Sequence, residues 1–274
     1  MRKRVFSTFL ALCLLLSLLP VSVSADGEGS GLSAEDPMAV PVAGMNITGT
    51  TYNGLSQTWL NSIYSGEGPM YFTIEIPEAV TTIAANAFRG STQANVVNID
   101  FSKATSLTTI KSQAAYNCAS LTGVLDLSKT KVEIIEKLAF GGCKGLTGVI
   151  LPNTLKYLGA ADGSGGSIFR DCSGLEFVRT AGGDPEAVFE LPDGLKVIGG
   201  QTFQDIFPEG FDVKIKIPAS VEIIGSQAFK SDNSTFSQIY IERTSGYEGY
   251  NSGAFKAQDT AKSALLIFPD SDAY

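Results

Sequence analysis

A short pattern of apolar residues recurs along the chain, and this recurrence constrains the fold more than any other feature of the sequence. The pattern is an apolar residue, two further residues, Ile or Leu, a few residues, and then an aromatic residue that usually follows Ala. Because a segment of this size cannot bury its own apolar face, the repetition predicts coils that stack on one another. The copies are Val80, Ile83 and Phe88; Leu107, Ile110 and Tyr116; Val132, Ile135 and Phe140; Leu155, Leu158 and Phe169; Leu195, Ile198 and Phe203; and Val221, Ile224 and Phe229.

A second pattern, alternating apolar residues that often end in proline, precedes most copies. Alternation with period two and many β-branched residues predict strands with one buried face. The residues expected at the strand centres, facing solvent, are Glu75, Asn98, Asp126, Ile150, Glu190, Lys216, Tyr240 and Ile267. Their separations run from 23 to 28 residues, apart from one of 40. We attribute that long separation to two insertions, a glycine-rich surface loop at Gly159–Ser167 and a second segment at Arg179–Ala187.

A strand and a short turn repeated every ~20–29 residues predict a leucine-rich repeat. We therefore expect an α/β solenoid with a parallel β-sheet on one face and short helical turns on the other. The expected boundaries are a signal peptide over 1–25, a flexible leader over 26–45, an N-terminal cap over 46–70 and the solenoid over 71–274. Residues 55–63 predict a short amphipathic helix in the cap. The chain stops just after a strand with no evident cap, as a fragment of a longer array would.

Residues 1–25 have the three parts of a secretory signal peptide. Positive charges at residues 2–4 precede an apolar run from Val5 to Leu19, and residues 23–25 are small enough for cleavage. The run is shorter than the ~20 residues that a membrane-spanning helix needs. These features predict a secreted or cell-surface protein.

Charge and composition argue against several classes of function. The formal charge is −8, and loss of the three cations in residues 1–25 would make it −11. Such an acidic chain lacks the Lys and Arg excess that holds nucleic acid or anionic lipid, so we expect neither nucleic acid binding nor direct membrane binding. The chain has no histidine, which removes Ser-His-Asp, Cys-His and HExxH sites together. We expect no catalytic residue, no metal and no cofactor.

Three cysteines follow the repeat. Cys118, Cys143 and Cys172 are 25 and 29 residues apart, which is not the C-x2-C spacing of metal ligands. The spacing predicts a column of small buried thiols. A disulfide between Cys118 and Cys143 is the alternative, because adjacent coils lie ~5 Å apart and an exported protein permits the bond.

Taken together, these patterns resemble the BspA-like, or treponemal, class of bacterial leucine-rich repeats. The resemblance rests on Ile74-Glu75-Ile76-Pro77 through Phe88, on Val132 through Leu146 with Cys143, and on the Leu-Thr-Gly triplets at residues 121 and 146. It covers about residues 70 to 269. It implies a curved solenoid with one parallel sheet, exported or displayed at the cell surface, that mediates adhesion or binds proteins of host or neighbouring cells. The two insertions, and the lack of a sorting motif after Phe268, depart from that pattern.

The expected function is therefore protein binding or adhesion through the solvent-facing column, with a protein or surface glycoprotein as partner. Exposed Ile150 and Tyr240 favour an interface, because apolar and aromatic side chains anchor interfaces. Ordinary strand-forming residues would give the same pattern. Two alternatives stay open. One is a structural spacer in a larger surface protein, and the other is a glycan hydrolase using carboxylates such as Glu75 and Asp126, although nothing marks one pair as acid and base.

Overall fold

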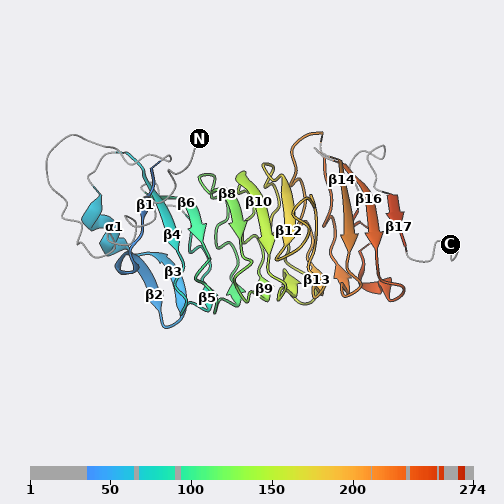
Figure 1. The fold of residues 1–274 in the computed structure, drawn as a ribbon, viewed down its shortest axis with the longest axis horizontal. Coiled ribbons are helices and arrows are strands. Elements are labelled where there is room, and N and C mark those ends of the chain that lie inside the picture. Colours follow the sequence, from blue (N-terminus) through green and yellow to red (C-terminus); the bar gives the residue numbers. More distant parts are fainter. Residues whose placement is uncertain are drawn as a thin grey trace, which may run out of the picture. The chain divides into compact units, whose positions relative to one another are not determined.

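The chain folds into a parallel β-solenoid, in which each coil contributes strands to two sides of a stack (Figure 1). The computed structural model describes residues 36–64, 68–89, 94–210, 212–232, 235–251, 253–255 and 265–268. All of them belong to one compact unit, Gly31–Tyr274. The signal peptide predicted over 1–25 lies outside the described residues.

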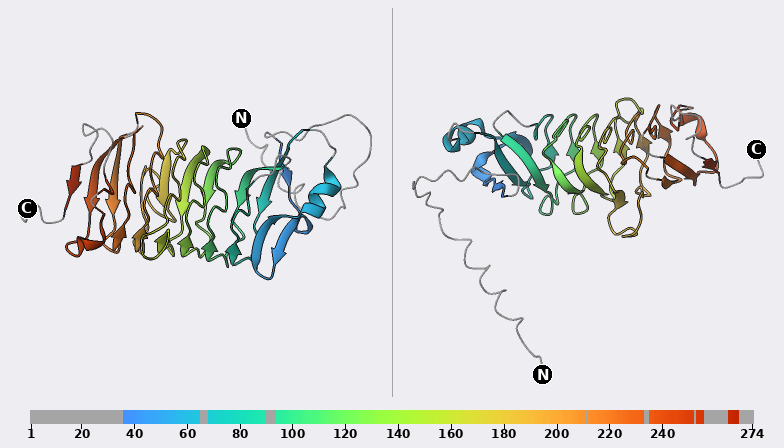
Figure 2. Two further views of the ribbon diagram at one scale, coloured as in Figure 1. Left: turned by 180° about the vertical axis from the view of Figure 1, so that it is seen from behind. Right: turned by 90° about the horizontal axis from the view of Figure 1, so that it is seen from above.

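The longer strands lie on one side, which we call the long-strand face. All neighbours within its sheets are parallel, as expected when each coil repeats the path of the one before it. Figures 1 and 2 show these strands following one another in sequence order along the stack. The face consists of three sheets: β1 (Met38–Ala39), β4 (Met70–Glu75) and β6 (Ala94–Asp100); β8 (Thr122–Asp126), β10 (Gly145–Leu151) and β12 (Phe177–Thr180); and β14 (Asp212–Ile217), β16 (Thr235–Ile241) and β17 (Leu265–Ile267).

The other side, the short-strand face, is a single eight-stranded sheet in the order β15-β13-β11-β9-β7-β5-β3-β2. Six of its strands have two residues each, and the second residue of each is fully buried. The strands are β2 (Met45–Thr48), β3 (Thr51–Leu55), β5 (Thr82–Ile83), β7 (Thr109–Ile110), β9 (Ile134–Ile135), β11 (Tyr157–Leu158), β13 (Val197–Ile198) and β15 (Ile223–Ile224).

The predicted short helical turns on this side are therefore wrong. In the part of the chain that the structure describes, helices are limited to α1 (Gln57–Ile63) and the 3-10 turns η1 (Val42–Gly44) and η2 (Tyr247–Gly249). The repeat instead places Thr, Ile, Val or Tyr beside each buried Ile or Leu, and such β-branched and aromatic residues favour an extended backbone.

A third set of hydrogen bonds joins the coils at the turn that carries the phenylalanine. Two residues before that position, the backbone is left-handed, with φ from 58° to 61° in the six coils. This conformation directs the N–H toward the next coil: Gln113 donates to the carbonyl of Lys137, and Leu138 to that of Gly166, both at 3.0 Å. A left-handed L-residue costs ~1–2 kcal/mol. The bonds along the stack compensate for that cost.

Phenylalanines stack in a file through the interior. The ring centroids of Phe140 and Phe169 are 5.8 Å apart and those of Phe169 and Phe203 are 6.1 Å apart, with planes within 15° of parallel. Phe203 and Phe229 continue the file at 5.4 Å. The file therefore passes through the stretched fourth copy without a break. The glycine-rich segment forms a surface loop as predicted over residues 160–165, whereas Gly159, Gly166 and Ser167 are buried.

The second copy departs from this file. The sequence predicts Tyr116 for its aromatic position, and this prediction is wrong by one residue. Because Gln113 has the left-handed φ, Ala115 occupies the position and Tyr116 is only partly buried. Phe101, at a strand-end position where other coils carry Ile or Leu, packs edge-on against Phe88 with 6.4 Å between centroids. Phe101 therefore brings a ring against Phe88 in the one coil whose turn position carries Ala115 in place of Phe.

Residues 46–70, the predicted cap, contain a hairpin and the predicted helix. β2 and β3 pair antiparallel, and β3 extends the short-strand face by pairing with β5. The helix is confirmed as α1, which begins after Ser56, whose Oγ accepts the N–H of Trp59 at 3.4 Å. The Trp59 ring then lies 5.7 Å from that of Phe72 on β4. Aromatic packing thus joins α1 to the first long strand of the stack.

The predicted flexible leader over 26–45 is too long. β1 (Met38–Ala39) pairs in parallel with β4 and adds an edge strand to the long-strand face. Val40, directly after it, is buried and donates its N–H to the carbonyl of Thr73 at 3.0 Å. Proline and small residues give this segment the composition of a linker. Without it, β4 would be an edge strand, and the backbone groups on that edge pair with the segment.

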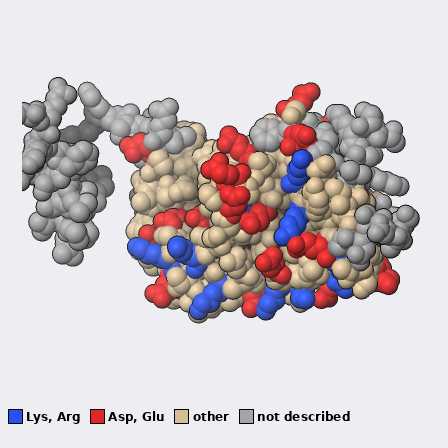
Figure 3. All heavy atoms as spheres, turned by 45° about the vertical axis from the view of Figure 1, so that its right-hand side comes forward, with Lys and Arg blue, Asp and Glu red and all other residues tan. Residues whose placement is uncertain are grey.

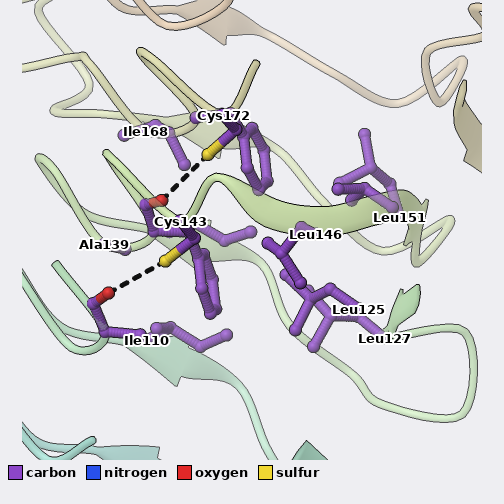
Figure 4. Close-up of a cluster of buried hydrophobic side chains, with 14 of the residues drawn as sticks. Ile110, Leu125, Leu127, Ala139, Cys143, Leu146, Leu151, Ile168 and Cys172 are labelled. Atoms are coloured by element: carbon purple, nitrogen blue, oxygen red, sulfur yellow. Dashed lines mark hydrogen bonds between the residues drawn. The ribbon is translucent and has the colours of Figure 1, made fainter. Parts of the chain in front are cut away.

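The three cysteines form the predicted column of buried thiols, and Figure 4 shows Cys143 and Cys172 of this column. Each Sγ donates to a carbonyl of the preceding coil: Cys118 to Phe88 at 3.0 Å, Cys143 to Ala115 at 3.0 Å, and Cys172 to Phe140 at 3.1 Å. These are thiols and not disulfides. Burial raises the pKa of the Cys172 thiol to about 12 and also raises the pKa of Cys143.

We expect Phe169→Ala to lower the free energy of unfolding by about 3–5 kcal/mol, because it leaves a cavity in the middle of the ring file. Urea unfolding followed by circular dichroism would measure the loss. Phe177→Ala is the matched control, since Phe177 lies on the outer surface, and its cost should be about 1 kcal/mol. Equal losses would contradict the central role of the file.

The thiol column predicts slow reaction of the thiols in the folded state. The chain without residues 1–25 should react with Ellman's reagent only slowly at pH 8, because the thiols are buried and the raised pKa values keep them protonated. After unfolding in guanidinium without reductant, all three should react. Recovery of a single thiol would indicate the disulfide instead.

Candidate binding surface

The long-strand face presents two columns of outward side chains, two residues apart along each strand. Register defines them, since paired residues on neighbouring strands point the same way. Glu75 pairs with Asp100, and Thr73 pairs with Asn98. The prediction that Asn98 continues the column of Glu75 is therefore wrong by two residues. Asn98 is exposed as predicted, but it belongs to the second column.

At the N-terminal end the column is acidic, and each carboxylate already has a partner. Glu75 forms an ion pair with Lys103, with 2.9 Å between Oε1 and Nζ, and this hydrogen bond raises the pKa of Lys103. Asp100 and Asp126 each accept the N–H of the serine two residues later, at 2.8 Å. Such a turn shapes the chain as it leaves the strand. These three carboxylates therefore have structural roles.

The centre of the face carries a row of apolar residues that the predicted column misses. Register places Val124 beside Gly148 and Gly148 beside Phe177. A bridge between Val178 and Phe189 then places Val188 next to Phe177. Val124 and Val188 are 41% and 39% exposed, which is uncommon for valine in a folded protein.

Ile150 and Arg179 adjoin this row in the first column, where they pair directly. The guanidinium carbon of Arg179 lies 4.2 Å from the ring centroid of Phe177, as in a cation–π contact. Gly148 makes room for that ring, since a Cβ there would lie 2.2 Å from Cζ of Phe177. We call Val124, Gly148, Ile150, Phe177, Arg179 and Val188 the central patch.

The second insertion builds part of this patch, and its predicted start at Arg179 is wrong. Arg179 and Thr180 belong to β12, an additional strand paired with β10. Arg179 Nε donates to the carbonyl of Ala187 at 2.5 Å and so closes the loop that follows. Glu190 is partly buried, and its carboxylate accepts the Thr180 hydroxyl at 2.6 Å. Glu190 therefore holds the second insertion in place, and its carboxylate is already hydrogen-bonded within the protein.

The C-terminal end of the column agrees with prediction. Lys216 pairs with Tyr240, and Tyr240 with Ile267. Tyr240 is 42% exposed, and its hydroxyl donates to Oε1 of Gln238 at 3.2 Å. Lys216 forms an ion pair with Glu242 at 2.7 Å, and this hydrogen bond raises the pKa of Lys216.

The predicted column leaves out β12, although the spacing of the cysteines in the sequence indicates this strand. Cys143 is followed six residues later by the buried Val149, and Cys172 is followed six residues later by the buried Val178. The thiol column thus aligns the two strands and would have placed Phe177 and Arg179 on the outer surface.

The remaining surface is mixed in charge. Figure 3 shows acidic side chains gathered toward the middle of the visible face and both signs of charge along its lower edge. No group of three or more His, Cys, Asp or Glu that could hold a metal ion occurs within the described ranges. Across the same residues, no helix is both long and apolar enough to cross a membrane.

Stacked coils, parallel strands and a repeating Ile and Phe interior define a leucine-rich-repeat solenoid. A family model for the BspA type leucine rich repeat region matches residues 70–181 and 187–267 in six copies. The chain belongs to this family, which confirms the resemblance seen in the sequence. The gap between the two matched segments falls on the loop that Arg179 closes.

The chain is less similar to individual proteins than to the family. None of the curated proteins compared with the chain matches it. Among solved structures, the chain is similar to a leucine rich cell surface protein from Faecalibacterium prausnitzii A2-165, with 20% identity and a TM-score of 0.38. The likeness covers 74% of this chain and 62% of that one.

We expect Arg179→Ala to loosen the loop at residues 181–187 without unfolding the stack. Its hydrogen bond to Ala187 and its contact with Phe177 would both be lost, so amide exchange in the loop should accelerate about tenfold. Hydrogen exchange with mass spectrometry would measure this. Lys216→Ala removes a cation from the same face without touching the loop, and an equal acceleration there would contradict the assignment.

Proposed function

We propose that this protein is exported and binds a protein or surface glycoprotein of a host or neighbouring cell through the long-strand face. Family membership supports a repeat protein of the bacterial leucine-rich class. The signal-peptide pattern of residues 1–25 supports export to the cell surface or beyond. Parallel solenoid sheets provide extended surfaces suited to partners of this size.

The central patch is the observation that carries the proposal. Two exposed valines, a half-buried ring and an arginine lie in register over four neighbouring strand positions, with Gly148 between Val124 and Phe177. Contiguous apolar surface of this kind usually marks an interaction site. Arginine and aromatic side chains are enriched among the residues that dominate binding energy, and the surrounding Asp126 and Glu190 provide a polar rim.

The carboxylate-based hydrolase is less well supported by this geometry. It needs one carboxyl group held as an acid and a second as base or nucleophile across a substrate. Here Glu75 is paired with Lys103, Asp126 accepts a backbone N–H, and Glu190 accepts a hydroxyl. Each of these three carboxylates therefore already has a partner within the fold.

The test starts with a pull-down of the chain lacking residues 1–25 against matrix and cell-surface proteins, followed by affinity measurements with the partner identified. Val124→Glu combined with Val188→Glu should weaken binding at least tenfold, because two charges would have to be desolvated in the interface. Their exposure should keep the stability change within about 1 kcal/mol.

Two controls locate the site. Thr82→Glu places the same charge on the short-strand face and should leave binding unchanged. Lys216→Ala combined with Tyr240→Ala alters the far end of the long-strand face and should cost less than the central pair. Full affinity in the Val124 and Val188 double variant would overturn the proposal.

A further inference from the structure

The short-strand face has its own outward column, and one member is covered. The first residues of the two-residue strands pair in register: Ile134 with Tyr157, Tyr157 with Val197, and Val197 with Ile223. Val197 is only 2% exposed, although Ile134, Tyr157 and Ile223 are all partly exposed. Something therefore lies over Val197 and leaves its neighbours open.

The cover is the first insertion. The loop leaves β11 at Gly159, and a Cβ at Gly163 would lie 2.5 Å from Cγ2 of Ile223, two strands away. The loop thus crosses over Val197. It is internally fixed, because Ala160 N–H donates to the Ser164 carbonyl at 3.0 Å and Asp162 accepts both the N–H and the hydroxyl of Ser164.

A pocket of about 450 Å³ remains between this loop and the preceding coils. Ile134 and Tyr157 form its floor, Ala160, Ser164 and Gly165 line it from the loop, and Glu136 and Lys137 line it from the coil before. Apolar floors with a few polar groups at the edge are typical of small-molecule sites. The fixed loop means that the pocket exists before a ligand arrives, which lowers the entropic cost of binding.

The charges around the pocket favour an anion. The Glu136 carboxylate is already engaged, with Oε1 2.7 Å from Lys111 Nζ and Oε2 accepting the N–H of Ser112 at 3.1 Å. The stem of Lys137 runs along Gly165, with its Cβ 3.5 Å from where a Gly165 Cβ would lie. No salt bridge of Lys137 is found within the described part of the chain. Lys137 lines the pocket, so its ammonium group can reach an anion bound on the apolar floor.

We propose that this pocket binds an organic acid whose carboxylate is adjacent to an aromatic or branched aliphatic group. The apolar group lies on Ile134 and Tyr157, and the carboxylate accepts hydrogen bonds from Lys137. The same chemistry occurs in a free acid and at the C-terminal residue of a peptide. The site is on the opposite side from the central patch and does not depend on it.

The probe is N-acetylphenylalanine, titrated into the isotopically labelled chain lacking residues 1–25. Its binding should shift the backbone amides of residues 159–165 and 136–137 in heteronuclear NMR spectra. N-acetylphenylalanine amide, which lacks the carboxylate, should bind at least tenfold more weakly. A peptide ending in phenylalanine that binds as well as the probe identifies a chain terminus as an acceptable source, and a peptide that fails identifies the free acid.

Two variants test the assigned contacts. Lys137→Gln should weaken the probe about tenfold by removing a charge-assisted hydrogen bond. Tyr157→Thr should weaken it to a similar extent while keeping the fold, because Thr82 and Thr109 occupy the same column in other coils. Lys129→Gln is the charge control and should change nothing.

The proposal is overturned if saturating probe leaves the amides of residues 159–165 unshifted. It is also overturned if the acid and the amide bind equally, or if Lys137→Gln keeps full affinity. None of these results bears on the long-strand face, whose variants are measured with a different ligand.

Discussion

The structure depends on registration of each coil against its neighbours at three places. The long strands, the two-residue strands and the left-handed turns each supply backbone hydrogen bonds along the stack. Each coil must therefore place its long strand, its two-residue strand and its left-handed turn at fixed positions, while the lengths of the connecting segments can vary. Extra residues are accommodated only between these segments, which is where both insertions leave the stack. The two candidate binding sites adjoin these insertions for the same reason.

Much of the interior could be predicted from sequence because each coil reuses the same positions for Val, Ile and Phe. The errors arose where a local pattern permits two alignments. Val97-Asn98-Ile99 and Ile99-Asp100-Phe101 alternate equally well, and a shift of two residues keeps the same face outward. Only pairing with β4 distinguishes them. The prediction of helical turns was wrong for a similar reason. A single buried Ile between two loops shows no periodicity that could distinguish a helix from a strand.

The candidate binding surface was predictable where the strands follow the ordinary repeat and not where an insertion contributes a strand. Lys216, Tyr240 and Ile150 lie on the outer face because their strands follow the ordinary repeat. The central patch depends on β12, a strand contributed by an irregular segment, and on the Val178–Phe189 bridge that brings Val188 alongside. The chain comes back beside Val178 at Phe189, only eleven residues later, and a spacing this short does not follow the repeat in the sequence.

The exchange between Ala115 and Phe101 means that the coils are not interchangeable parts. The coil that contains Ala115 has no ring at its turn position. Its strand ends in Phe101, which packs beside Phe88 of the coil before. In a second copy of that coil placed directly after it, Phe101 would lie beside Ala115 and would lack the ring that Phe88 provides. An added repeat that keeps this contact would therefore have to include the coil before it as well.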